Sequence, residues 1–400
     1  MKILFINHFP LVGSGSGVYT TSLAKSLISL GHQVCAIMPE NETKNIYDPE
    51  FKDFKLHPVY FKGEEEIEGQ LDFNFPCFTI HPKSKLNFYD MTYDEYDKYC
   101  NAFDKAIKEE IEHFKPDVIH SGHIWTLSKI ACKYDVPVVV TSHGTDIIGL
   151  EKGDRFKKDA EFVVEHAKKI IAVSNDNGKL IKEFFPESNP VVINAGFDSN
   201  VFNLHEYDKK ELLKKYKIEY DNQKIILYAG KLTHIKGVDV LLKAAKLYEK
   251  DKNIITIIAG NGVLRTELKN LAKDLQLKNV YFIGHKSQKT LKKIYNIADV
   301  FAMPSRKEAF GLVGVEALAC GLPVVSTKAG GMKDYVTPKV GKLVEVENEK
   351  ELAKALLYVI NNKEKYKKED LANYAKENFA QEKTLNKLLS IYQEAIDMNK

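Results

Sequence analysis

Short apolar segments alternate with helical patterns along most of this 400-residue chain, and the alternation limits the folds open to it. Each segment is rich in Val and Ile, is apolar on both faces and ends near Gly, Pro, Ser or His, as buried parallel strands do. The pattern predicts an α/β protein with two Rossmann-like, doubly wound parallel-sheet domains that face each other across a cleft. The predicted strands are residues 2–7, 33–38, 117–121, 137–142, 169–174, 190–194, 224–230, 255–260, 280–284, 299–304 and 323–327.

The length of the chain also favours two domains, because 400 residues exceed the usual size of one hydrophobic core. We place the N-terminal domain at residues 1–198 and the C-terminal domain at 199–378, with the boundary in a polar stretch. Residues 379–400 form a final amphipathic helix that we expect to pack back towards the N-terminal domain. Residues at about 43–98 are aromatic-rich and interrupt the alternation, so we expect an irregular insertion there.

The composition excludes several classes of function. A net charge of +3 is too balanced to indicate a nucleic-acid partner. The sequence lacks an apolar run long enough for a membrane span, and its first apolar run is too short for a signal peptide. The five cysteines are scattered without a C-x-x-C pair, so we expect a cytoplasmic protein without zinc or disulfides. Peripheral contact with the inner face of a membrane stays open, and so does the oligomeric state.

Two lysines stand at the end of a predicted strand in the second half. Lys231 and Lys236 flank a loop that follows Gly230, and Gly237 opens a predicted helix. Two ammonium groups beside a helix N-terminus form an anion site, and a diphosphate suits it. The alternative is two solvated surface lysines, and this loop alone does not decide between them.

Two glutamates with seven residues between them follow the predicted strand 299–304. Glu308 lies in the loop, and Glu316 lies in a helix that begins near Gly311. Eight helical steps would place the two carboxylates roughly 12 Å apart, comparable to the span from the ribose to the hexose of a sugar nucleotide. Free N–H groups at the start of the helix can hold the phosphates between them. In the alternative, Glu308 is solvated and Glu316 pairs with a nearby lysine. This alternative is credible for either glutamate alone, but less so for both glutamates together with the glycines.

Taken in order, these motifs resemble the retaining glycosyltransferases of family 4, which have the GT-B fold. The resemblance rests on Lys231-x4-Lys236-Gly237 followed by Glu308-x7-Glu316. It implies that Glu316 binds the ribose, that Glu308 contacts the donor-sugar hydroxyls and that both lysines bind the donor diphosphate. The family often has Arg at the first lysine position, and lysine keeps the charge but loses the planar fork. The resemblance extends over nearly the whole chain, through residues 13–17, 143–146, 192–198, 259–268, 280–284 and 328–336.

The resemblance also implies roles for the rest of the donor site. Ile283 and His285 match the base-binding edge, and Gly15 and Ser16 would bring backbone N–H groups near the β-phosphate and the acceptor. His143 would face the donor sugar near the reacting carbon, where it orients the sugar or stabilises charge; its alternative is a turn cap. We therefore expect His143, Glu308 and Lys236 to be catalytic. The segment whose backbone would meet the phosphate and sugar is Ala309, Phe310, Gly311, Leu312 and Val313.

Candidates for the acceptor side follow strand ends or lie in the aromatic insertion. They are His123, Trp125, Asp146, Phe75 and Phe78, and we hypothesise that residues 75–82 line the acceptor pocket. Trp125 would stack on a sugar. The alternatives are a core tryptophan and a turn histidine at 123, and the sequence leaves both open.

The reaction implied by the resemblance moves a hexosyl or N-acetylhexosaminyl group, with retention, from a nucleotide diphosphate sugar to an acceptor hydroxyl. We expect a UDP-sugar by default, a front-face mechanism without metal or other cofactor, and a glycan, lipid-linked or small-molecule acceptor. The alternatives are a nonhydrolysing sugar-nucleotide epimerase and a non-catalytic sugar-nucleotide binding protein. A nicotinamide dehydrogenase is disfavoured because "GSGSG" gives its glycine spacing imperfectly.

Overall fold

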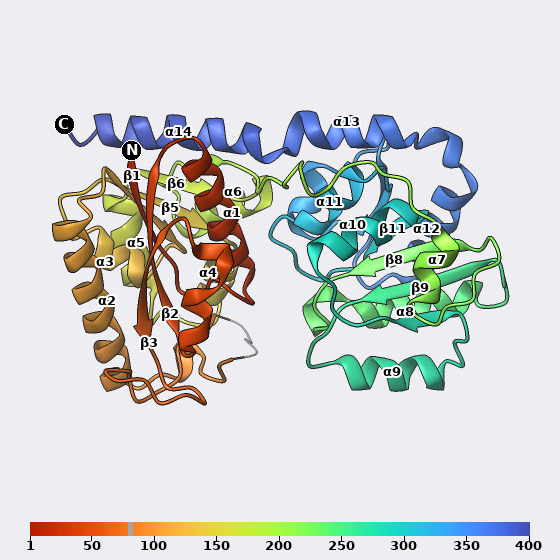
Figure 1. The fold of residues 1–400 in the computed structure, drawn as a ribbon, viewed down its shortest axis with the longest axis horizontal. Helices are drawn as coiled ribbons and strands as arrows, with labels where there is room; N and C mark the ends of the chain where they lie inside the picture. The colour runs from red at the N-terminus through yellow and green to blue at the C-terminus, as the bar shows by residue number, and fades with distance from the viewer. Residues whose placement is uncertain (79–82) are drawn as a thin grey trace. The chain divides into compact units, whose positions relative to one another are not determined.

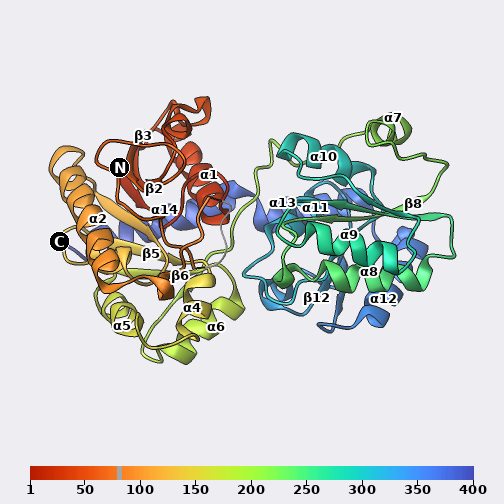
Figure 2. The same ribbon diagram turned by 90° about the horizontal axis from the view of Figure 1, so that it is seen from below.

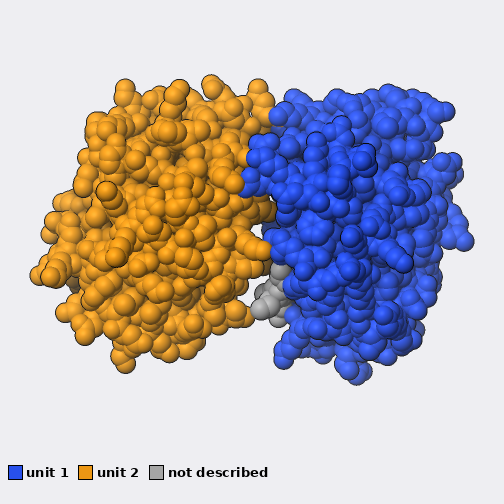
Figure 3. All heavy atoms as spheres, turned by 180° about the vertical axis from the view of Figure 1, so that it is seen from behind, with its two compact units in different colours: residues 1–194, 384–400 blue, residues 195–383 orange. Residues whose placement is uncertain are grey.

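The computed structural model describes residues 1–78 and 83–400, which form two compact units. Unit 1 comprises residues 1–194 and 384–400, and unit 2 comprises residues 195–383 (Figure 3). The sequence-based boundaries were 198/199 and 378/379, within five residues of these divisions.

Unit 1 is built on a seven-stranded parallel sheet in the order β3-β2-β1-β4-β5-β6-β7 (Figure 1). Its strands are β1 (Lys2–Ile6), β2 (Gln33–Glu40), β3 (Lys55–Tyr60), β4 (Val118–Gly122), β5 (Val138–Ser142), β6 (Lys169–Ala172) and β7 (Val191–Val192). Its helices are α1 (Gly15–Ser29), α2 (Tyr93–His113), α3 (Leu127–Ala131), α4 (Thr145–Leu150), α5 (Lys157–His166), α6 (Asn175–Phe184) and most of α14 (Gln381–Asp397). Short 3-10 turns are η1 (Thr43–Tyr47), η2 (Pro49–Phe51) and η3 (Phe88–Asp90).

The two faces of this sheet are buried in separate apolar clusters. Side chains of successive strand residues point to opposite faces, so Ile3 of β1 packs with α1 and α14, whereas Leu4 packs on the α2 side. Leu388 of α14 is fully buried in the first of these clusters. The C-terminal helix therefore completes the core of unit 1.

Unit 2 repeats the topology with six parallel strands in the order β10-β9-β8-β11-β12-β13. The strands are β8 (Lys224–Ala229), β9 (Ile254–Ala259), β10 (Val280–Phe282), β11 (Val300–Met303), β12 (Val324–Thr327) and β13 (Gly341–Val344). The helices are α7 (Lys209–Lys214), α8 (Val238–Tyr248), α9 (Arg265–Asp274), α10 (Gln288–Ile297), α11 (Leu312–Ala319), α12 (Glu349–Asn361) and α13 (Lys368–Phe379). The 3-10 turns are η4 (His234–Lys236), η5 (Gly330–Asp334) and η6 (Lys363–Lys365). Figure 2 shows α8, α9 and α12 on one side of β8 and α10 on the other. The predicted fold class, two Rossmann-like α/β domains, is confirmed.

The predicted irregular insertion is wrong in part, because β3 lies within it and α2 begins at Tyr93. β3 extends the sheet as an edge strand parallel to β2, with Cys35 opposite Lys55 and Glu40 opposite Tyr60. It escaped prediction because "KLHPVY" carries polar residues and a proline, which an edge strand tolerates. The short edge strand β13 was missed as well. Residues 79–82, part of the proposed acceptor segment, lie outside the described residues.

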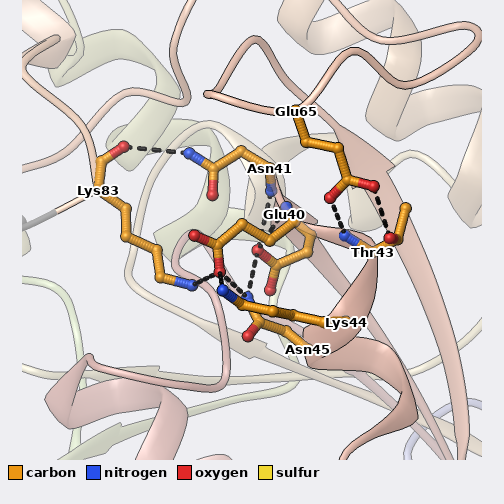
Figure 4. Close-up of polar contacts among 8 residues, drawn as sticks. Glu40, Asn41, Thr43, Lys44, Asn45, Glu65 and Lys83 are labelled. Atoms are coloured by element: carbon orange, nitrogen blue, oxygen red, sulfur yellow. Dashed lines mark hydrogen bonds and ion pairs between the residues drawn. The ribbon is translucent and has the colours of Figure 1, made fainter.

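Figure 4 shows the polar contacts that hold the turn after β2. Glu40, the buried last residue of β2, accepts hydrogen bonds from the Asn41 backbone N–H (2.8 Å) and the Asn45 side-chain amide (2.9 Å). Glu65 accepts hydrogen bonds from both the backbone N–H (2.8 Å) and the hydroxyl of Thr43 (2.6 Å). These bonds satisfy a buried carboxylate and tie the insertion to the sheet.

Among the described residues, every helix is too short or too polar to cross a bilayer.

Candidate active site

The strand order defines one ligand-binding edge in each unit. The order in which strands are added switches sides at β1, which lies between β2 and β4, and at β8, which lies between β9 and β11. In open α/β sheets, ligands bind at the carboxyl ends of the strands at such a switch point. The segments that follow β8 and β11 carry the lysines and glutamates predicted from the sequence.

Lys236 and Glu308 are brought into direct contact across the switch point of unit 2. The Lys236 Nζ lies 2.5 Å from Oε2 of Glu308, and the Ser305 hydroxyl donates to the same oxygen at 3.3 Å. The two side chains are 27% and 12% exposed, so water screens the ion pair only in part. A cation suited to a diphosphate and a carboxylate suited to sugar hydroxyls therefore stand side by side.

Two glycines allow the loops of this site to touch through their backbones. Gly237 has a φ of 64°, and a Cβ there would lie 2.0 Å from the carbonyl oxygen of Pro304. Gly330 has a φ of 74°, and a Cβ there would lie 1.8 Å from the carbonyl oxygen of Glu308. The Thr327 hydroxyl adds a hydrogen bond of 2.6 Å to the Ser305 carbonyl oxygen. Side chains at either glycine would push the Glu308 loop away from its neighbours.

The helix that follows Glu308 offers an uncapped N-terminus. Gly311 is its N-cap residue with a φ of 83°, and within the described part of the chain no side chain caps the first turn of α11. Leu312 and Val313 are partly buried first-turn residues whose N–H groups lack intrahelical acceptors by geometry, as an anion site requires. Phe310 is 3% exposed and its ring packs on Tyr335, so its side chain is not available to a ligand.

Glu316 lies one turn into α11 and is 6% exposed. Burial raises the pKa of its carboxyl to about 8, although the neighbouring Tyr295 hydroxyl partly offsets this effect. The carboxyl is therefore poorly hydrated, and it is well suited to accept hydrogen bonds from a ligand diol.

The remaining predicted donor residues lie at the rim of this edge. Lys231 is exposed directly after β8, and Ala309 is partly buried beside Glu308. Ile283 is partly buried and His285 is exposed, and both follow the edge strand β10. Unit 2 therefore places these predicted donor residues beyond the carboxyl ends of its strands, whereas Gly15 and Ser16 lie in unit 1.

In unit 1, His143 follows β5 and lies, partly buried, among other aromatic side chains. Its ring centroid lies 5.2 Å from that of Tyr19 and 5.0 Å from that of His123. Burial and the neighbouring His123 lower the pKa of His143 to about 3, so its imidazole is neutral at physiological pH. A neutral imidazole can orient a hydroxyl but does not supply a positive charge.

Asn7, which the sequence reasoning missed, follows β1 at the switch point of unit 1. It is 2% exposed, yet neither polar atom of its amide has a hydrogen-bond partner among the described residues. Its Oδ1 and the Nε2 of His143 both approach Gly122, since a Cβ there would lie 3.4 Å and 3.7 Å from them. The signal available in the sequence was a polar residue directly after the first strand.

Two other buried polar atoms near the strand ends also lack partners among the described residues: Nδ1 of His123 and Oγ of Ser16. Ser16 and the exposed Gly15 are the first residues of α1. Buried polar groups are normally paired, so this edge of unit 1 offers hydrogen-bonding capacity to a ligand or to water.

The structure corrects four of the acceptor-side predictions. Trp125 is fully buried, and its indole N–H donates to the Asp146 carbonyl oxygen at 3.1 Å. Phe75 and Phe78 are 0% and 3% exposed, and Phe78 stacks on His123. The buried Asp146 carboxylate accepts the Ile124 N–H (2.9 Å) and the Ser142 hydroxyl (3.0 Å). These four residues belong to the core under the insertion, so the rings of Trp125, Phe75 and Phe78 are not open to a sugar.

Known protein families match this chain over nearly its whole length. Residues 13–201 match the family described as Glycosyltransferase Family 4, and residues 209–378 match Glycosyl transferases group 1. The uncharacterized glycosyltransferase MJ1607 of Methanocaldococcus jannaschii is 31% identical over 289 residues, covering 66% of this chain and 74% of the relative. The N-acetyl-alpha-D-glucosaminyl L-malate synthase of Bacillus anthracis is 24% identical over 407 residues, covering 98% and 96%.

Solved structures show the same fold. Sucrose-phosphate synthase from Thermosynechococcus elongatus superposes with a TM-score of 0.78 at 18% identity, covering 100% of both chains. Anabaena Alr3699/HepE in complex with UDP superposes with a TM-score of 0.75 at 19% identity, covering 98% of this chain and 99% of that one. Fold and sequence matches together define a glycosyltransferase with the GT-B fold. Within that class the chain belongs to glycosyltransferase family 4, which confirms the predicted resemblance.

Proposed function

We propose that the protein is a retaining glycosyltransferase that moves a hexosyl or N-acetylhexosaminyl group from a nucleoside diphosphate sugar to an acceptor hydroxyl. The observation that carries the proposal is the contact of 2.5 Å between Lys236 and Glu308 at the switch point of unit 2. We take a UDP-sugar as the first donor to test. The similar Anabaena HepE has been solved with UDP and with UDP-glucose, and one relative is named N-acetyl-alpha-D-glucosaminyl L-malate synthase.

In this proposal each donor group meets one element of unit 2. Glu316 accepts the ribose hydroxyls, and Glu308 accepts hydroxyls of the transferred sugar. Lys231, Lys236 and the uncapped N-terminus of α11 neutralise the diphosphate. The lysines take the part that a divalent cation plays elsewhere, so we propose that no metal or other cofactor is required.

The proposed chemical step is a front-face displacement. The bond between the anomeric carbon and the diphosphate oxygen breaks, and its electron pair stays with the leaving group. The acceptor oxygen bonds to the same face of the carbon, and its proton passes to the departing diphosphate. Lys236 and the N–H groups of α11 stabilise the growing negative charge on that diphosphate, which lowers the barrier.

We propose that unit 1 binds the acceptor at the carboxyl ends of β1, β4 and β5. The neutral His143 offers hydrogen bonds suited to hydroxyl groups, and so does the side-chain amide of Asn7, which has no partner among the residues that the structure describes. Glycan, lipid-linked and small-molecule acceptors all fit this chemistry. We place the reaction in the cytoplasm, with peripheral membrane contact for a lipid-linked acceptor.

The test is a screen of UDP-, GDP- and ADP-sugars by proton NMR, without an added acceptor. We expect slow diphosphate release from one donor and a free sugar that first appears with the anomeric configuration of the donor. A sugar of inverted configuration would contradict retention. Interconversion of C2 epimers would instead indicate the epimerase, and donor binding without any turnover would indicate the binding protein.

A further inference from the structure

Arg306 lies two residues before Glu308, and its side chain is committed to contacts within unit 2. Its Nη1 and Nη2 donate to the two carboxylate oxygens of Asp239, at 2.8 Å and 2.7 Å. Nη1 also donates to the His234 carbonyl oxygen at 2.7 Å. Its Nε and Nη2 donate to the Glu347 carboxylate, the second at 3.0 Å.

These contacts use all five N–H groups of the guanidinium. The side chain is 13% exposed, so water competes little for them. A donor diphosphate would have to break an existing bond to reach Arg306. We conclude that Arg306 does not itself bind the donor.

The partners of Arg306 surround the loop that carries Lys236. His234 begins η4, whose last residue is Lys236, and Asp239 lies in the first turn of α8. The backbone N–H of Arg306 adds a bond of 2.7 Å to the Ile235 carbonyl oxygen. The residues on both sides of Lys236 are therefore tied to the segment that carries Glu308.

Glu347 connects the same guanidinium to a third segment, the loop between β13 and α12. This residue has a positive φ of 62°, a conformation that is uncommon outside glycine and that its neighbours must hold in place. Three loops that are far apart in the sequence thus meet at one planar group.

We propose that Arg306 is a positioning residue that sets the spacing between Lys236 and Glu308 for donor binding. The inference rests on the proposed function in giving these two residues their roles. It adds that the ion pair between Lys236 and Glu308 is held in position by the Arg306 side chain, which does not contact the substrate.

Lysine is the informative replacement, because it keeps the charge and offers three donors from a single point instead of a planar fork. If Arg306 acts only through its charge, Arg306→Lys will resemble the wild type. If it acts by position, Arg306→Lys will let the Lys236 loop drift and will weaken the contact with Glu308.

The first measurement requires no donor. Lys236 is labelled with a limiting amount of an amine-reactive acetylating reagent, and its modification is quantified by mass spectrometry. Lys169 is the internal control, because it is 25% exposed and lies 2.8 Å from Glu394, much as Lys236 is paired with Glu308. We expect labelling of Lys236 to rise about threefold or more in Arg306→Lys when its ion pair loosens, with Lys169 unchanged. Equal labelling of Lys236 in both proteins would overturn the proposal.

The second measurement is a double-mutant cycle on donor affinity, using Arg306→Lys, Lys236→Ala and the double variant. We expect Arg306→Lys to weaken donor binding about tenfold in the wild-type background and less than about twofold in the Lys236→Ala background. If the losses of donor affinity in the two single variants add fully in the double variant, positioning through Lys236 is contradicted. Arg155→Lys, a change of the same kind in unit 1, should leave donor affinity unaltered.

The two measurements separate the two claims. If the wild type binds no nucleoside diphosphate sugar, the proposed function fails, and the labelling result still decides whether Arg306 holds the pair. If the wild type binds a donor and Arg306→Lys binds it equally well, the proposed function stands and the role of Arg306 is refuted. Equal melting temperatures for Arg306→Lys and Arg155→Lys would show that the donor effect does not come from unfolding.

Discussion

Gly330 and Glu308 are in backbone contact, so close that a Cβ on Gly330 would lie 1.8 Å from the Glu308 carbonyl oxygen. A methyl group therefore has no room unless the Glu308 loop moves. We predict that Gly330→Ala lowers donor affinity at least about tenfold, because the loop shift separates Glu308 from Lys236. Calorimetric titration with the donor measures the change.

The matched control is Gly31→Ala. Gly31 has a similar φ of 83°, but a Cβ there would meet nothing within 4 Å. Gly31→Ala should lower the free energy of unfolding by about 1–2 kcal/mol, through left-handed backbone strain alone, and should leave donor affinity unchanged. If both variants behave alike, the contact between Gly330 and Glu308 has no part in donor binding.

Glu316 should make the stability of the protein depend on pH. Burial raises the pKa of its carboxyl from 4.5 to about 8. Between these values the folded protein holds a proton that the unfolded chain has lost, so this group makes stability fall as pH rises. We predict that Glu316→Gln, which cannot ionise, gains stability relative to the wild type by up to a few kcal/mol between pH 5 and pH 8.

Urea unfolding of both proteins at several pH values measures this difference. A stability difference that stays flat over the range would show that Glu316 is hydrated rather than buried. The same variant should lose donor affinity above about pH 8, where the Glu316 carboxyl is ionised and accepts a ribose diol better than an amide does.

Glu110 should show the opposite dependence on pH. Its side chain is 3% exposed and lies 2.6 Å from the Lys55 ammonium and 2.7 Å from Nδ1 of His57. Burial alone would raise the pKa of Glu110, but the hydrogen bonds from Lys55 and His57 outweigh it and lower the pKa below 4.5. The ionised carboxylate therefore adds stability above pH 4.5 that is lost as the pH falls through the folded-state pKa.

We predict that Glu110→Gln lowers the free energy of unfolding by about 1–3 kcal/mol at pH 7. The difference from the wild type should shrink as the pH falls below about 4. Glu109→Gln serves as the control, since Glu109 is 42% exposed and lies 3.7 Å from His57. If Glu109→Gln lowers the free energy of unfolding by as much, the effect comes from the change in net charge and not from the buried contacts of Glu110.

Asn7 should matter for activity and little for stability. Its amide makes no hydrogen bond among the described residues, so Asn7→Leu removes a buried, unpaired polar group of similar size. We predict unchanged or higher stability, together with at least about a tenfold loss of kcat/KM for the acceptor. Thermal unfolding and acceptor kinetics test the two parts separately.

Asn177→Leu is the comparison for Asn7. Asn177 is also buried, but its side chain accepts from the Val173 N–H and donates to the Ser142 hydroxyl, both at 3.2 Å. This variant should lose about 1–3 kcal/mol of stability by leaving its partners unsatisfied. A loss of similar size in Asn7→Leu would show that Asn7 already has partners, such as ordered water.

Most of the fold was predictable because its central strands are continuous apolar runs. β1, β8 and β11 are buried on both faces, and their sequences show it directly. The edge strands β3 and β13 were missed because one side of an edge strand meets solvent and its sequence resembles a loop. The aromatic residues at about 43–98 were predicted to serve an acceptor, but Phe78 and Phe88 instead pack on the buried Trp125.

The candidate site was predictable where residues follow one another along the chain. The spacing from Glu308 to Glu316 and the glycines beside Lys236 are local signals. Arg306 was missed because its partners Asp239 and Glu347 lie 67 and 41 residues away, and only the folded chain shows that they meet. Asn7 was missed because an unpaired buried amide is a property of its surroundings.

The most direct test of the account is calorimetric titration of the wild type and of Lys236→Ala with UDP-, GDP- and ADP-sugars, with Lys169→Ala as a control for the loss of a paired lysine. The account predicts that one donor binds the wild type and Lys169→Ala equally. It predicts that the same donor binds Lys236→Ala about 100-fold more weakly, as expected when a charge-assisted contact with the diphosphate is lost. The account would be contradicted if no donor binds the wild type, or if Lys236→Ala binds it as well as the wild type does.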